Sequence, residues 1–143
     1  MVKAGKEAVE ISELLATLFH AHKRHMMGLA KDYGLTPQQT STLWLLDQNQ
    51  KLAMSELAEM LMCDASNVTG IVDKLEQRGL AQRVQGEDRR VKMLTLTEAG
   101  KKHNVEFHDR LFEPPEWLLK LTKEEQRQFR DLLRRAVESM PAE

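Results

Sequence analysis

The sequence predicts a mainly α-helical protein that carries one small β-hairpin, and three observations indicate this. The helix formers Leu, Ala, Glu, Lys, Gln and Met are abundant, whereas glycine occurs only 7 times in 143 residues. Apolar residues recur at helical spacing along several long segments. Two runs with strand character, at 80–84 and 91–96, flank the charged pentapeptide GEDRR, which has a suitable length for a hairpin connection.

Length and composition indicate one compact globular unit. The 143 residues are a common domain size, and 41% apolar with 30% charged residues are ordinary values. The single cysteine, Cys63, excludes an intrachain disulfide, which suits a reducing compartment. We find no apolar run with the length of a signal peptide or a membrane span. We therefore expect a cytoplasmic protein with no membrane partner.

The first 50 residues predict two helices. A long amphipathic helix is expected over residues 7–32, ended by Gly34. Its apolar stripe contains Ile11, Leu15, Leu18, His22, His25 and Leu29. Thr36 and Gln39 have the spacing of a capping box, which predicts a second helix that stops near residues 49–51.

Residues 55–79 predict two short helices joined by a tight turn. We expect Ser55 to cap the first, whose inner face is Leu57, Ala58 and Leu61. The turn lies around Cys63, and either Asp64 or Ser66 caps the second helix. Its inner face is Val68, Ile71, Val72 and Leu75, and Gly79 ends it. Two short helices around a tight turn make a helix-turn-helix pattern.

The hairpin follows this pattern directly, which makes residues 36–100 a winged helix-turn-helix domain with its wing at 80–96. Thr97 is expected to cap a third long helix, and the Pro114-Pro115 pair to break the chain. Thr122 and Glu125 form a capping box for the last helix. Its apolar face consists of Phe129, Leu132, Leu133, Ala136 and Val137.

The charge is distributed unevenly. The net charge of the chain is −1, but the segment from residue 74 to residue 92 carries six basic and three acidic residues, so that segment is +3 and the remainder is −4. The six basic residues are Lys74, Arg78, Arg83, Arg89, Arg90 and Lys92. Because electrostatic attraction is local at physiological salt, such a patch on a nearly neutral protein is compatible with nucleic-acid binding.

These features together resemble the MarR family (multiple-antibiotic-resistance regulators) of bacterial winged-helix transcription factors. The matching stretches are SELAEMLMCDASNVTGIVDKLEQRGLAQR, the wing GEDRR and VKMLTLTEAG. The resemblance implies a homodimer in which the helices at 7–32 and 101–140 form the dimerisation region. It also implies binding to a palindromic operator, commonly as a repressor, and release by a small aromatic or anionic effector.

The outer face of the second short helix is predicted to read DNA bases in the major groove. Its candidate contacts are Ser66, Asn67, Thr69, Gly70 and Lys74. The Asn67 amide can pair with adenine, and Lys74 suits a phosphate. Gly70 leaves room for a close backbone approach. The alternative for each polar residue taken singly is a solvated face, or a cap in the case of Ser66.

The wing tip is predicted to contact the minor groove, because a guanidinium is attracted to the negative potential of a narrow A·T-rich groove. Arg90 is the first candidate for this contact and Arg89 the second. Asp88 is expected to orient the wing by bonding an arginine or backbone N–H groups. Glu87 is interpreted as part of a solvated turn.

Three residues form a candidate effector pocket: His22, His25 and Trp44. We rank a core or interface role for the two histidines first, a pocket role second and a metal-binding role third, because no cluster with zinc-site spacing accompanies them. Cys63 has no basic neighbour in sequence to activate it, so a buried thiol is expected rather than a redox switch. No metal and no cofactor are predicted.

The chain lacks the motifs of the common enzyme classes. We find no glycine-rich phosphate loop, no Gly-x-Ser-x-Gly and no His-Glu-x-x-His, so an enzyme is not expected. Two alternatives remain beside an effector-released regulator. One is a metal-responsive regulator of the same fold, and the other is a winged-helix module for protein–protein contact.

Overall fold

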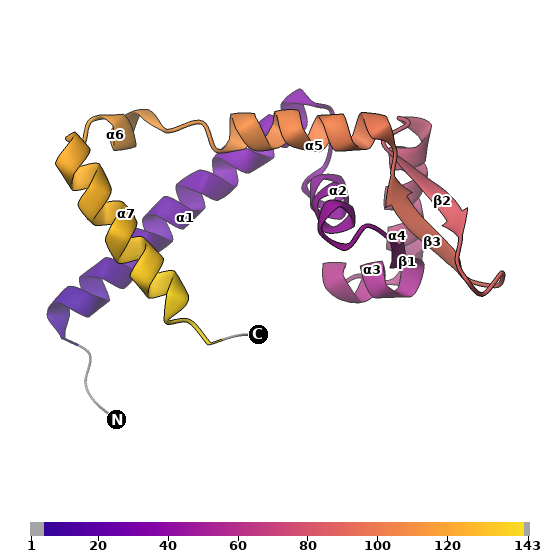
Figure 1. The fold of residues 1–143 in the computed structure, drawn as a ribbon, viewed down its shortest axis with the longest axis horizontal. Helices are drawn as coiled ribbons and strands as arrows, with labels where there is room; N and C mark the ends of the chain where they lie inside the picture. Colours follow the sequence, from indigo (N-terminus) through magenta and orange to yellow (C-terminus); the bar gives the residue numbers. More distant parts are fainter. Residues whose placement is uncertain (1–4, 142–143) are drawn as a thin grey trace. The chain divides into compact units, whose positions relative to one another are not determined.

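A computed structural model describes residues 5–141, and it confirms the mainly helical architecture with a small antiparallel sheet (Figure 1). The order of its elements is α1 (Lys6–Asp32), α2 (Pro37–Asn49), β1 (Leu52–Ala53), α3 (Met54–Leu61), α4 (Ala65–Gln77), β2 (Ala81–Gln85), β3 (Lys92–Leu96), α5 (Glu98–Leu111), α6 (Glu116–Leu119) and α7 (Lys123–Glu138). The chain separates into two compact units, which divide after Leu111.

Most of the expected helix boundaries are confirmed by their caps. The Thr36 hydroxyl accepts from the Gln39 N–H at 3.2 Å, and the Thr36 N–H donates to the Gln39 side chain at 3.0 Å. Gly34 and Gly79 follow α1 and α4 with φ values of +67° and +69°, a conformation that favours glycine.

The predicted cap at Ser55 is wrong. Ser55 is the second residue of α3, which begins at Met54. The Glu56 carboxylate instead accepts the backbone N–H of Ala53 at 2.7 Å, because the chain already turns into the helix directly after β1. The Glu56 side chain thus satisfies the Ala53 N–H, which has no partner within the helix.

The sheet contains a third strand that the sequence analysis did not predict. The strand order is β1–β3–β2, and both pairings are antiparallel. In the hairpin, Ala81 lies opposite Leu96 and Gln85 opposite Lys92. The two-residue strand β1 adds Leu52 opposite Leu94, which attaches the start of α3 to the hairpin.

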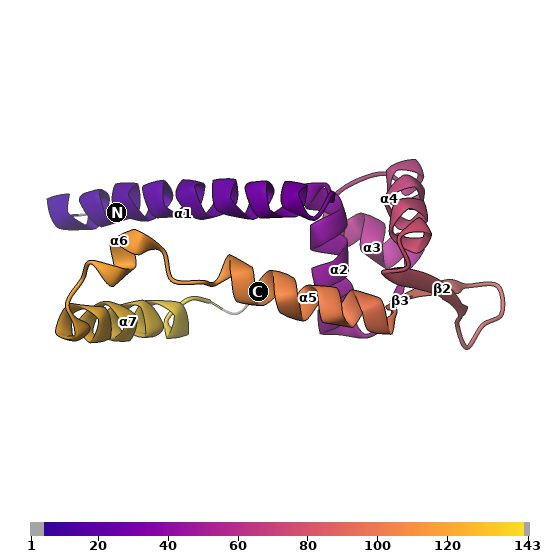
Figure 2. The same ribbon diagram turned by 90° about the horizontal axis from the view of Figure 1, so that it is seen from above.

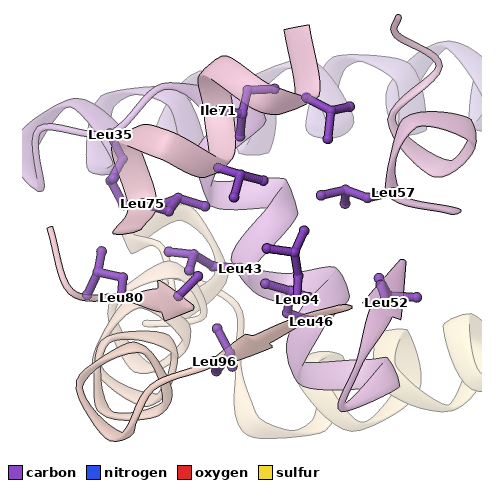
Figure 3. Packing of buried hydrophobic residues seen from close by; sticks show 13 residues of the cluster. Leu35, Leu43, Leu46, Leu52, Leu57, Ile71, Leu75, Leu80, Leu94 and Leu96 are labelled. Atoms are coloured by element: carbon purple, nitrogen blue, oxygen red, sulfur yellow. The ribbon is translucent and has the colours of Figure 1, made fainter. Parts of the chain in front are cut away.

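One hydrophobic core holds the winged-helix elements together (Figure 3). Figure 3 shows leucines from α2, α3, α4 and β3 converging on each other. Leu43, Leu57 and Leu75 are fully buried there, and so is Leu94 from the wing strand. Because α4 and the wing share this core, their outward-facing residues are carried on one scaffold.

The C-terminal end of α1 packs on α5 in a second, smaller cluster that contains Leu29, Ala30 and Phe107. His103 is buried here, and its ring lies 4.9 Å from that of Tyr33 in an edge-to-face arrangement. The burial of His103 was not predicted; the one signal for it in the sequence is its spacing of four residues from Phe107. The N-terminal part of α1 projects away from α2 and the sheet (Figure 2).

His103 is expected to make the stability of the fold depend on pH. Burial, and secondly the Arg78 guanidinium, lower the pKa of His103 below its ordinary value of 6.5. The unfolded chain therefore takes up this proton at a higher pH than the folded chain, so stability is full above the ordinary pKa and declines as the pH falls through the lowered one. Urea unfolding between about pH 8 and pH 5 should show a smaller decline for His103→Phe than for the wild type. An equal decline in both would contradict this role.

Helices α1 and α7 carry large apolar side chains that the chain itself leaves exposed. On α1, Ile11, Leu14 and Phe19 are 56%, 57% and 65% exposed. None of the described residues of α7 is buried, and Leu132 and Val137 are 61% and 65% exposed. Exposed large apolar side chains gathered on one helix typically mark an interaction site. None of the described helices has the length and apolarity that crossing a bilayer requires.

Candidate nucleic-acid interface

Helix α4 presents one apolar and one polar face. Val68, Ile71, Val72 and Leu75 are buried in the core. The predicted base-reading residues all remain exposed on the other side, namely Ser66, Asn67, Thr69, Gly70 and Lys74. Because the inner face is held by the core, the orientation of the outer face is set by packing rather than by the exposed residues themselves.

The first turn of α4 resolves which residue caps it. The Asp64 carboxylate accepts from the Asn67 N–H at 2.9 Å and from the Ser66 hydroxyl at 2.8 Å. These two hydrogen bonds, that of Asn67 first, lower the pKa of Asp64. Asp64 is therefore the N-cap, and Ser66 supports it.

Asn67 carries the side-chain amide on the exposed face of α4, and its neighbours Ser66 and Thr69 are hydrogen-bonded within the helix. The Thr69 hydroxyl donates to the Ala65 carbonyl at 3.0 Å, as the Ser66 hydroxyl does to Asp64. In the described part of the chain, the Asn67 side-chain amide has no hydrogen-bond partner. Its donor and its acceptor can therefore both face an adenine edge, which presents the complementary pair.

Gly70 lies in the middle of α4, where glycine weakens a helix. A Cβ atom added at Gly70 meets no atom within 4 Å, so packing within the chain does not require a glycine there. A glycine at this position would be explained if the backbone of a bound ligand approached α4 closely here.

Gly70→Ala is thus expected to change stability and DNA affinity in opposite directions. The free energy of unfolding should rise by about 0.5–1 kcal/mol from helix propensity, while DNA affinity falls because the new methyl group meets the duplex. Urea unfolding and fluorescence anisotropy with labelled duplex measure the two quantities. Unchanged affinity for Gly70→Ala would remove the close-approach role.

The wing tip is a closed turn with its charged side chains outside. The Gly86 N–H donates to the Val91 carbonyl at 3.0 Å, and the Val91 N–H donates to the Asp88 carbonyl at 2.9 Å. The Asp88 carboxylate accepts the backbone N–H of Arg90 at 3.0 Å. Glu87, Arg89 and Arg90 are exposed, and the tip extends beyond α4 (Figure 1).

Two of the six basic residues in the +3 segment are engaged inside the domain. The Arg78 guanidinium donates to the carbonyls of Gly34 and Tyr33, at 2.8 and 2.7 Å, and so satisfies the end of α1. Arg83 pairs with Asp73 and Glu76. The exposed basic residues that remain for a ligand are Lys74, Arg89, Arg90 and Lys92.

The candidate effector residues lie on two helices. His22 and His25 are exposed on α1, which contradicts a place in the core of the chain and leaves their interface role a prediction, and Trp44 on α2 is 59% exposed. The His25 ring nitrogen Nε2 lies 3.4 Å from the Arg110 carbonyl on α5. The face of α1 that carries His22 and His25 is exposed in a single chain, and for that reason the two histidines are not in the core.

Cys63 and a metal site were also considered from the sequence. Cys63 is half-buried against the main core rather than fully buried. Within residues 5–141, no three His, Cys, Asp or Glu side chains are grouped so that they could hold a metal ion.

Comparison with known proteins identifies the family. The model of the MarR family matches residues 35–92, which include α2, α3, α4 and most of the wing. Over 101 residues the chain is 35% identical to the HTH-type transcriptional repressor MdtR of Bacillus subtilis (strain 168). The chain belongs to the MarR family. The alignment with MdtR covers 70% of the chain and 65% of MdtR, so the chain spans just under two thirds of the length of this relative.

Solved MarR-family structures share the fold. The YusO protein from Bacillus subtilis superposes with a TM-score of 0.76 at 29% identity, covering 96% of this chain and 100% of that one. A point mutant of MepR from S. aureus, bound to an oligodeoxyribonucleotide, superposes with a TM-score of 0.72 at 25% identity, covering 92% and 98%. These likenesses extend the MarR-family fold beyond the residues matched by the family model.

Proposed function

We propose that this MarR-family protein is a sequence-specific DNA-binding transcriptional regulator, acting as a repressor on a palindromic operator. The observation that carries the proposal is the placement of the exposed face of α4 and the arginine-bearing wing tip on one shared core. The helix suits a major groove and the wing a minor groove. The named relative MdtR is a transcriptional repressor, and the MepR mutant was solved with DNA.

In this proposal Asn67 pairs with a base, whereas Ser66, Thr69 and Lys74 contact bases or phosphates. Gly70 allows the backbone to approach closely. Arg90, supported by Arg89, enters the minor groove. Asp88 fixes the shape of the tip through its bond to the Arg90 N–H.

The regulator is proposed to act as a homodimer through residues 7–32 and 101–140. The support is the exposed apolar surface of α1 and α7, which a single chain leaves in water. Burying it against a second copy is favourable at about 25 cal/mol per Å² of apolar surface. A small aromatic or anionic effector near His22, His25 and Trp44 is proposed to release the DNA.

A titration at two salt concentrations tests this function. The full-length protein is mixed with labelled A·T-rich palindromic duplex, and its mass in solution is measured by light scattering. A regulator of this kind should bind as a dimer and lose affinity steeply between about 50 and 200 mM salt, because phosphate contacts release counterions. Negligible affinity at both concentrations would overturn the proposal and favour a protein–protein adaptor.

A further inference from the structure

A single arginine joins the wing to helix α4. Arg83 lies in β2, the first strand of the wing, and its side chain is 25% exposed. Its guanidinium pairs with Asp73 through Nη2, at 2.8 Å from the carboxylate oxygen, and with Glu76 through Nη1. The Glu76 carboxylate also accepts the backbone N–H of Arg83 at 3.3 Å.

These contacts differ from an ordinary surface ion pair. Three hydrogen bonds run between α4 and the strand that follows it, and the forked guanidinium holds two carboxylates at once. A planar fork fixes direction as well as distance, which a flexible ammonium group does not do. The geometry therefore restrains the angle between α4 and the wing strand as well as their separation.

The position of the two carboxylates is costly for DNA binding unless they have another role. Asp73 shares α4 with the base-reading residues, and its side chain is 50% exposed. An unpaired carboxylate there repels phosphate. Pairing with Arg83 offsets this charge, and it anchors the strand that leads to the wing tip.

We propose that Arg83, held by Asp73 and Glu76, is a positioning residue that sets the wing relative to α4. The contacts of α4 in the major groove and of the wing tip in the minor groove then form together, as one coupled interface. This inference rests on the proposed DNA-binding function.

Simple electrostatics and positioning predict opposite outcomes for one variant. Asp73→Asn combined with Glu76→Gln removes two negative charges from the DNA-facing region. If charge alone mattered, affinity for every duplex would rise. If the carboxylates hold Arg83 in place, affinity for the preferred duplex falls relative to affinity for a shuffled one.

The experiment first lets the wild-type protein select its preferred duplex from a random pool. Affinities for that duplex and for a shuffled duplex of the same composition are then measured for four proteins. These are the wild type, Arg83→Gln, Arg83→Lys and the Asp73→Asn/Glu76→Gln variant. Thermal unfolding of each shows that it is folded, and the two-carboxylate variant carries the test if Arg83→Gln does not fold.

The expected result is a fall of about tenfold in the ratio of preferred to shuffled affinity in all three variants, the size of a typical coupling between contacting groups. Arg83→Lys should not restore the ratio, because lysine lacks the fork. A ratio equal to or above that of the wild type in the two-carboxylate variant overturns the inference. Absence of DNA binding by the wild type is a different outcome, which contradicts the proposed function itself.

Discussion

Gly100→Ala is expected to lower the free energy of unfolding by about 2 kcal/mol. A Cβ atom built on Gly100 would lie 2.0 Å from the carbonyl oxygen of Leu80 and 3.2 Å from the Leu96 side chain. The Leu80 carbonyl also accepts the Thr97 N–H at 3.2 Å, so it cannot withdraw without losing that bond. Overpacking of this kind usually costs about 1–3 kcal/mol.

Urea unfolding at one fixed protomer concentration measures this loss, since any association adds to the apparent stability. Gly28→Ala is the matched control, because its Cβ would meet nothing within 4 Å. That control should gain up to about 1 kcal/mol from helix propensity. Equal stability changes in the two variants would show that the close approach of α5 to the start of the wing does not require glycine.

Arg90→Ala is expected to weaken DNA binding by about 1–3 kcal/mol while the protein stays folded and the proposed dimer stays intact. Arg90 is exposed at the wing tip, and its backbone N–H is held by Asp88, so the substitution removes a guanidinium without disturbing packing. Fluorescence anisotropy at a low and a high salt concentration measures the loss. The fall of DNA affinity with rising salt should also become shallower, because the variant has one fewer cation near the phosphates.

Glu87→Ala is the control at the same turn. Glu87 is exposed and is assigned to solvent, so its removal should not weaken binding. If Arg90→Ala binds as tightly as the wild type at both salt concentrations, Arg90 has no role in the wing contact.

Local signals in the sequence predicted much of this fold because they depend on neighbouring residues. The capping boxes at Thr36 and Thr122 are present as expected, and so is the cap at Thr97, whose hydroxyl accepts the Gly100 N–H at 3.0 Å. Each of these motifs is completed within three residues, so the sequence alone contains both partners.

Long-range contacts could not be predicted in the same way. The pairing of β1 with β3 places Leu52 opposite Leu94, and the sequence of a two-residue strand does not indicate which strand it pairs with. From the sequence, Arg78 and Arg83 belong to the basic segment that could bind DNA. In the structure Arg78 bonds the Gly34 carbonyl and Arg83 pairs with Asp73. His103 was missed because a histidine in a charged helix carries little sign of burial.

The placement of individual site residues was predicted in part. The exposed face of α4 follows directly from helical periodicity once Val68, Ile71 and Val72 are assigned to the core. The sequence left open whether His22 and His25 face the core of the chain or an interface, because an apolar stripe looks the same whether it faces its own core or another chain. Their proposed effector role, like the DNA contacts, stays a prediction.

Selection of binding sites from a pool of random duplex DNA by the full-length protein tests the central claim most directly. The account predicts enrichment of a palindrome whose half-sites lie about 10 base pairs apart, or a multiple of that spacing, since two symmetry-related α4 helices would read successive major grooves. It also predicts A·T-rich positions where the wings reach the minor groove. A pool that stays unenriched after repeated rounds, or that yields only asymmetric single sites, would contradict it.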